Sequence, residues 1–290
     1  MSRSRSVSFA VLALLFNAFV WGVSWWPLRA LQARGLHPLW ATAGIYALAL
    51  VVLFVLRPGV WRAFAQFGAL WLLAIAAGLT NLGFNWAVTT GDVVRVVLLF
   101  YLMPLWSVLL AWPLLGEQPR PAGLARMALA LAGVVVVLKA PGVDWPWPES
   151  GVDWLAIGAG LCFALTNILL RRLHAAPGPA RAVAMFGGGT AAAALVALLG
   201  TAQGWVAVPP APGWGWPAIG LVLAAAFLLG NMALQYGASR LPAQTTSLVM
   251  LSEVLFASAS SIAAGAAQPA AQTYVGGALI VLAALWSALR

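Results

Sequence analysis

The chain has 290 residues, of which 63% are hydrophobic and only 7% are charged, with a formal net charge of +9 and a mean hydropathy of +0.96. Ordinary globular domains carry roughly 25% charged residues, so this composition excludes a soluble fold and predicts a polytopic membrane protein. A single cysteine, Cys162, excludes an intramolecular disulfide.

Ten apolar stretches are long enough to cross a membrane as helices, which takes about 20 residues each. They are continuous runs rich in Leu, Ala and Val, unlike the short alternating segments of a membrane β-barrel. The predicted fold is therefore an all-α integral membrane protein with ten transmembrane helices. The stretches cover residues 9–29, 39–56, 67–87, 94–115, 122–140, 152–170, 182–200, 215–236, 243–265 and 272–289.

The first stretch follows Arg3 and Arg5 and could imitate a signal peptide. It is long, however, and contains Asn17 and several tryptophans, so we interpret it as a retained helix. With a cytoplasmic N-terminus, the basic residues fall mostly on the inner side, as the positive-inside rule requires, and both chain ends are expected in the cytoplasm. The four basic residues expected outside are Arg29, Arg34, Arg95 and Lys139.

The same polar pattern occurs once in each half of the chain. Asn81, Asn85 and Trp86 in the third stretch correspond to Asn231, Gln235 and Tyr236 in the eighth. A related corner follows each time, beginning at Gly116 in the first half and at Gly265 in the second half.

The repeat predicts two units, residues 1–145 and 146–290, of five helices each. An odd number of spans inserts the second copy upside down, so the units form inverted repeats around a central cavity, an arrangement typical of transporters. The copies diverge where Pro104 aligns with Glu253.

Two motifs resemble a known family. They are Trp21-Gly22-Val23-Ser24 in the first stretch and the run from Met103-Pro104 through Gly116-Glu117 to Gly133-Val134-Val135. On these residues the chain resembles the ten-helix, EamA-type family of the drug/metabolite transporter superfamily, and within it the bacterial exporters of aromatic and other apolar amino acids of the YddG type. The resemblance implies a bacterial inner-membrane location and efflux by alternating access.

The amides are the first candidate substrate-binding residues. Asn81 and Asn85 are four residues apart, as are Asn231 and Gln235, so each pair projects from one helix face. Uncharged amides offer both donors and acceptors, which suits a zwitterion. Interhelical hydrogen bonding is the structural alternative.

Aromatic and hydroxyl side chains complete the predicted lining. Rings could stack on an aromatic substrate or simply pack between helices or against lipid. Tyr46 and Tyr101 each place a hydroxyl inside an apolar stretch, and Pro104 is a candidate hinge because it removes a backbone donor. The remaining candidates are Trp21, Ser24, Trp25, Phe163 and Asn167.

Glu253 is the only carboxylate deep in an apolar stretch. An acid at that depth is costly, and it indicates either a proton or cation site or a hydrogen bond to a neighbouring helix. The sequence shows no set of nucleophile and base, no cluster of metal ligands and no ring of charge, which argues against an enzyme, a metal site and a charged channel.

The preferred function is export of neutral aromatic and other large apolar amino acids. The alternative is a proton-coupled exporter of lipophilic cations or drugs, for which Glu253 and the aromatic residues would supply the site. The expected partners are the small-molecule substrate and the bilayer. No cofactor, no nucleic acid and no obligatory protein partner is implied.

Overall fold

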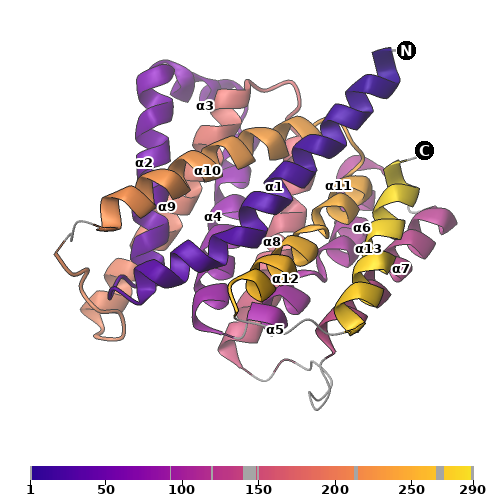
Figure 1. Cartoon of the computed structure of the whole chain (residues 1–290). Helices are drawn as coiled ribbons and strands as arrows, with labels where there is room; N and C mark the ends of the chain where they lie inside the picture. The colour runs from indigo at the N-terminus through magenta and orange to yellow at the C-terminus, as the bar shows by residue number, and fades with distance from the viewer. Residues whose placement is uncertain are drawn as a thin grey trace.

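The computed structural model describes residues 2–91, 93–118, 120–139, 148, 150–211, 215–265 and 271–288. All regular structure in these ranges is helical, and the two chain ends lie on the same side of the bundle (Figure 1). The longer helices are α1 (Ser2–Gln32), α2 (Pro38–Leu56), α4 (Ala69–Thr90), α7 (Pro121–Leu138), α8 (Gly151–Arg172), α9 (Gly178–Ala202), α10 (Gly215–Ala238) and α13 (Ala271–Ala288). The shorter ones are η1 (Val60–Arg62), α3 (Ala63–Gln66), α5 (Val93–Phe100), α6 (Met103–Leu115), α11 (Ala243–Met250) and α12 (Glu253–Ala263).

Within the described ranges, seven helical segments are long and apolar enough to cross a membrane, and one of them combines α11 and α12. Many large apolar side chains face outward, among them Trp71, which is 62% exposed. Apolar surface of this extent is unfavourable in water, so the outside of the bundle is a lipid-facing surface. The chain is an all-α, multi-pass membrane protein. Three shorter apolar helices are Met103–Leu115, Pro121–Val136 and Tyr274–Ala283.

Two of the predicted stretches are interrupted near their middle. The stretch 94–115 is divided between α5 and α6, and the stretch 243–265 between α11 and α12. Pro104 lies in the first turn of α6, where its missing N–H costs no helical hydrogen bond. Glu253 opens α12, where an acidic side chain is favourable. The sequence alignment of Pro104 with Glu253 therefore corresponds to two helix starts.

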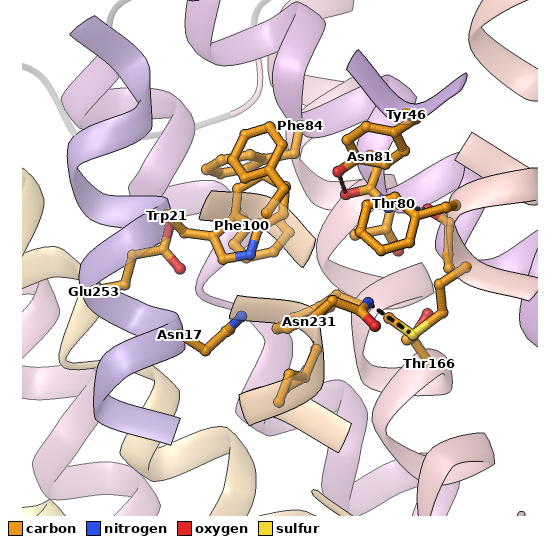
Figure 2. A pocket seen from close by; sticks show the side chains of 16 residues that line it. Asn17, Trp21, Tyr46, Thr80, Asn81, Phe84, Phe100, Thr166, Asn231 and Glu253 are labelled. Atoms are coloured by element: carbon orange, nitrogen blue, oxygen red, sulfur yellow. Dashed lines mark hydrogen bonds between the residues drawn. The ribbon is translucent and has the colours of Figure 1, made fainter. Parts of the chain in front are cut away.

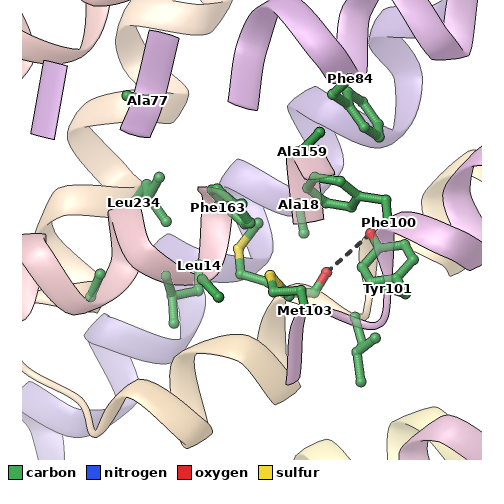
Figure 3. Packing of buried hydrophobic residues seen from close by; sticks show 14 of the residues in the cluster. Leu14, Ala18, Ala77, Phe84, Phe100, Tyr101, Met103, Ala159, Phe163 and Leu234 are labelled. Atoms are coloured by element: carbon green, nitrogen blue, oxygen red, sulfur yellow. Dashed lines mark hydrogen bonds between the residues drawn. The ribbon is translucent and has the colours of Figure 1, made fainter. Parts of the chain in front are cut away.

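The two interruptions face each other. The Tyr101 hydroxyl donates to the Met250 carbonyl oxygen at 3.5 Å, within the packed core that Figure 3 shows. One helical turn beyond the first break, the hydroxyl oxygens of Ser107 and Ser247 lie 2.5 Å apart. Both serines are completely buried, so these polar contacts join α6 to α11 inside apolar surroundings.

The predicted corners both end a helix. Gly116 follows α6 with φ of 70°, and Gly265 follows α12 closely with φ of 69°. Left-handed backbone at a helix C-terminus favours glycine, because a Cβ would be strained there. After the first corner, Glu117 Oε2 accepts from the Ala243 N–H at 3.3 Å, and Glu117 Oε1 lies 3.7 Å from Arg171 Nε. Residues 266–270 of the second corner lie outside the described residues.

The interior of the bundle brings helices of the two halves together. α4 packs on α8 and α9, while α10 packs on α1 and α2. Glycines allow the closest approach: a Cβ on Gly78 would lie 2.5 Å from the carbonyl oxygen of Gly188, and one on Gly188 would overlap the Ala74 carbonyl. This spacing brings α4 and α9 close enough to enclose one side of a central cavity.

Several tryptophans lie near helix ends, where membrane proteins carry a belt of interfacial aromatic residues. Trp154 is 63% exposed at the start of α8, as an interfacial residue would be. Trp205 instead stacks on Trp86, with ring centroids 5.6 Å apart. Trp145, Trp147 and Trp214 lie outside the described residues.

Candidate functional site

A cavity lies at the centre of the bundle, where α1, α2, α4, α8, α9 and α10 meet the two broken helices (Figure 2). Its surface is mostly apolar and aromatic, with a few amides, hydroxyls and one carboxyl group. The residues around it are Asn17, Trp21, Tyr46, Ala77, Thr80, Asn81, Phe84, Phe100, Phe163, Thr166, Met185, Phe186, Phe227, Asn231, Leu234 and Glu253.

Aromatic rings form a continuous wall of the cavity. Trp21 stacks on Phe227 with ring centroids 4.6 Å apart and an interplanar angle of 15°. Its edge also meets Phe84, which packs on Phe100 at 4.6 Å, and Phe100 stacks on Phe163 at 5.6 Å. Such pairs contribute about 0.5–1.5 kcal/mol each beyond area burial. The wall is therefore held rigid by its own contacts.

Tyr46 and Asn81 form the polar corner of the cavity. The Tyr46 hydroxyl donates to Asn81 Oδ1 at 2.6 Å, and Asn81 Nδ2 donates to the Ala77 carbonyl oxygen at 2.7 Å. Both ends of the Asn81 amide are thus engaged, and its orientation is fixed. A fixed amide beside a tyrosine hydroxyl offers both donor and acceptor character to a small polar ligand.

A second polar corner lies across the cavity. Asn231 Nδ2 donates to Met185 Sδ at 3.1 Å, and Asn17 Nδ2 donates to the Gly230 carbonyl oxygen at 2.8 Å. Asn17 Oδ1 is buried and has no hydrogen-bond partner in the described part of the chain. An unpaired buried acceptor is costly, so a ligand donor at this point would be stabilising.

The other two predicted amides lie behind the wall. Asn85 Nδ2 donates to the Thr42 hydroxyl at 2.9 Å, joining α4 to α2. The Gln235 amide lies 2.6 Å from the Asn231 amide. When the Gln235 oxygen faces the Ala182 N–H, the Gln235 amide nitrogen donates to the Gly178 carbonyl oxygen at 3.0 Å. The expectation that each amide pair faces the cavity therefore holds for Asn81 and Asn231, whereas their partners on the next turn support the wall.

Glu253 carries the carboxyl group at the cavity. It is only 4% exposed, and Figure 2 places it beside Trp21 and on the same side as Asn17. Lys, Arg and His are absent from the cavity lining in the described residues. The site therefore combines one acidic group with aromatic rings, which favours a cationic or ammonium-bearing ligand.

Four further predicted residues lie outside the cavity lining. The Ser24 hydroxyl donates to the Trp21 carbonyl oxygen within α1. Trp25 Nε1 donates to the Ser260 hydroxyl at 2.9 Å, joining α1 to α12. Tyr101 fills the break before α6, and Asn167 Nδ2 lies 4.0 Å from Met103 Sδ. The Trp25 contact thus joins two helices beside the cavity, whereas the Ser24 contact stays within α1.

Sequence reasoning missed several lining residues. Asn17 carries a detectable signal, because it is an amide inside an apolar stretch, one turn before Trp21. Phe84, Phe100 and Phe227 carry none, since phenylalanine is equally common on lipid-facing surfaces of such helices. Among the described residues, groups of three or more His, Cys, Asp or Glu that could hold a metal ion do not occur.

Comparison with known proteins agrees with this architecture. A solved protein crystal structure superimposes with a TM-score of 0.76 over 97% of both chains at 23% identity, which establishes the fold. "Uncharacterized transporter PA0485" of Pseudomonas aeruginosa is 28% identical over 135 residues, which are 45% of this chain and 43% of that protein. The matched segment therefore spans less than half the length of this curated relative.

The family comparison covers the first half of the chain. Residues 8–139 match the EamA-like transporter family, and they include α1, α2, α4, α5, α6 and α7. The motifs at Trp21 and at Met103 to Gly133 lie within the match. Through residues 8–139, a little under half of its length, the chain is similar to the EamA-like transporter family.

Proposed function

We propose that this protein exports neutral aromatic and other large apolar amino acids by alternating access through the central cavity. The observation that carries the proposal is the composition of the cavity wall, in which stacked rings stand beside fixed amides and one carboxyl group. The proposal includes ten membrane crossings in two inverted repeats, residues 1–145 and 146–290, with α5 and α6 forming one crossing and α11 and α12 another.

The packing of the helices supports the inverted repeat. In the proposed repeat, the helices α1, α2, α4 and α6 correspond to α8, α9, α10 and α12. The contact between α4 and α8 then corresponds to the contact between α10 and α1, and both contacts exist. By the same correspondence, the contact between α4 and α9 matches that between α10 and α2. The contact between α6 and α8 matches that between α12 and α1, and all four of these contacts exist. A bundle with unrelated halves would not be expected to keep these pairs.

The cavity lining also supports it. Three pairs of residues at equivalent positions of the two halves meet at the cavity: Trp21 with Phe163, Asn81 with Asn231, and Phe84 with Leu234. A site built from both copies at the repeat interface is the arrangement that inverted-repeat transporters use.

The chemistry of the wall fits a zwitterion with a large apolar side chain. An ammonium group can face Glu253 and the ring of Trp21, while an apolar side chain packs among the phenylalanines. The amides of Asn81 and Asn231 can receive polar groups of either sign. The cavity wall carries no cation in the described residues, which disfavours a phosphate ester as substrate.

The distribution of charge supports a bacterial inner-membrane location with both chain ends in the cytoplasm. Arg171, Arg181 and Arg240 lie at the helix ends that share a side with the N- and C-termini. The opposite ends carry fewer cations, and the outer residue Arg95 forms a two-point ion pair with Asp153 at 3.0 Å. This asymmetry follows the positive-inside rule.

Flux of labelled phenylalanine in proteoliposomes of the purified protein tests the proposal. We expect saturable flux that empty liposomes lack and that Asn81→Ala reduces. Absence of saturable flux for phenylalanine, tryptophan and leucine alike would overturn the amino-acid assignment.

Glu253 also supports a second candidate, a proton-coupled exporter of lipophilic cations. A buried acid in an aromatic cavity suits a delocalised cation. Proton-driven movement of tetraphenylphosphonium in the same liposomes, without phenylalanine flux, would select this function.

A further inference from the structure

Arg181 is a buried guanidinium group for which the described residues supply no partner. It lies in the first turn of α9 and is 8% exposed. Nη1 is buried and has no hydrogen-bond partner, and the group forms no ion pair with a described residue. A buried donor without a partner is unfavourable, so an anion bound beside Nη1 would be stabilising.

The surroundings of Arg181 increase that cost. Arg240 acts on Arg181 electrostatically and has the same sign. Arg240 is itself engaged, because its guanidinium lies 3.8 Å from the centre of the Tyr236 ring and donates to the Tyr236 carbonyl oxygen. The N-terminus of α9 adds a positive partial charge. Every nearby contribution therefore favours an anion beside Arg181.

A chain of polar groups links Arg181 to the central cavity. Gly178 lies between the two side chains: a Cβ there would be 3.8 Å from Arg181 Nη2 and 3.8 Å from the end of the Gln235 amide, which donates to the Gly178 carbonyl oxygen. Gln235 in turn contacts Asn231 at 2.6 Å, and Asn231 lines the cavity. Arg181 is thus separated from the cavity by two amide side chains.

Gly178 also borders a depression in the surface of the protein. Gly178, with Pro177 and Pro179, lines a broad depression whose opposite wall is the segment from Leu56 to Val60. This depression lies at the same end of the bundle as the two chain termini (Figure 1). Arg57 is exposed at its rim, where it adds to a positive potential that attracts anions.

We propose that Arg181 binds the carboxylate of the substrate as it passes from this depression into the cavity. The inference rests on the proposed export of amino acids and places the two contacts in sequence: the carboxylate meets Arg181 on the way in, and the ammonium group meets Glu253 once the molecule is in the cavity. A single free guanidinium matches a monovalent carboxylate, whereas a phosphate group would engage several cations.

Binding measurements on the detergent-purified protein separate the two ends of the substrate. The probes are 3-phenylpropionate, which has the carboxylate but no ammonium group, and phenethylamine, which has the reverse. Loss of one charge-assisted hydrogen bond weakens binding by roughly 10- to 100-fold. We expect Arg181→Gln to weaken 3-phenylpropionate binding by about this factor and to leave phenethylamine binding unchanged.

Arg172→Gln is the matched control, since Arg172 is exposed at the same end of the bundle and should leave both probes unaffected. Arg181→Lys keeps the charge and should restore part of the affinity. Equal loss of both probes in Arg181→Gln would indicate a structural role and overturn the proposal. An effect present only in vesicles containing phosphatidylglycerol, and absent in pure phosphatidylcholine, would assign the site to lipid headgroups and also overturn it.

Failure of this site and failure of the proposed function give different results. If Arg181-dependent binding of 3-phenylpropionate occurs without any phenylalanine flux, the carboxylate site stands and the export proposal fails. If phenylalanine flux is saturable but insensitive to Arg181→Gln, the export proposal stands and the carboxylate site is overturned.

Discussion

The Tyr46 hydroxyl donates a 2.6 Å hydrogen bond to Asn81 Oδ1 across the interface of α2 and α4, at the wall of the central cavity. Both residues are buried, at 2% and 7% exposed. The bond fixes which face of the Asn81 amide a substrate meets. It therefore couples a contact between helices to the proposed binding site.

Tyr46→Phe removes only this donor. We expect kcat/KM for phenylalanine flux to fall by about 5- to 100-fold, because a buried acceptor without its partner costs about 1–3 kcal/mol. The double variant with Asn81→Ala should be no worse than Asn81→Ala alone, since the two residues act through one bond. Additive losses in the double variant would contradict this coupling.

Glu253→Gln tests the role of the carboxyl group. Glutamine keeps the size and a carbonyl oxygen but cannot carry a proton or a charge. If Glu253 couples protons, the variant should exchange labelled for unlabelled phenylalanine while losing the response to an imposed pH gradient. Flux should be measured with and without the gradient in the same liposomes. A response equal to that of the unmodified protein would remove Glu253 from proton coupling.

Gly188→Ala tests the close packing of α4 on α9. The added methyl group would overlap the Ala74 carbonyl, and backbone cannot move aside as a side chain can. We expect a loss of about 1–3 kcal/mol or more in stability, seen as a lower melting temperature in detergent. Gly187→Ala is the control, because a Cβ there meets no atom within 4 Å. Equal melting temperatures of the two variants would contradict the observed approach of the helices.

His37 predicts a pH dependence at the loop before α2. Its Nδ1 accepts from the Leu39 N–H at 3.2 Å as the N-cap of the helix, and burial lowers the pKa of His37 below 6.5. Because the unfolded chain binds the proton more readily, this contribution is complete above about pH 6.5 and is lost as pH falls through the lowered pKa. The N-cap contributes about 0.5–2 kcal/mol.

His37→Asn supplies an N-cap that does not titrate in this range. We expect the melting temperature of the unmodified protein to fall relative to that of this variant between pH 7 and pH 5. A constant difference across this range would show that His37 does not titrate with folding.

Local sequence signals were sufficient for most of the secondary structure. Long apolar runs predict helices in a bilayer because each backbone polar group must be paired within its own segment. Gly116 and Gly265 marked two helix ends, where the structure has the left-handed backbone that glycine favours. The interruption before Pro104 could also be anticipated, since proline prefers the first turn of a helix.

Which of the predicted residues line the cavity depended on the tertiary structure. Asn81 and Asn85 lie on one face of α4 and have the same composition signal, yet only Asn81 lines the cavity, because Thr42 of α2 engages Asn85. Similarly, Trp25 donates a hydrogen bond to Ser260 of α12, whereas Trp21 stacks on Phe227 at the cavity. Helical periodicity predicts which face of a helix a side chain lies on. Which residue that side chain contacts depends on the neighbouring helix.

The sequence by itself determined that the chain crosses a membrane and where its helices lie, because both follow from the hydropathy and backbone geometry of contiguous residues. The tertiary structure alone decided which phenylalanines enclose the cavity, that Glu253 faces it, and that Arg181 is buried without a described partner. These properties arise between residues more than 60 positions apart, such as Trp21 and Phe84. They depend on how the helices pack, which no local pattern encodes.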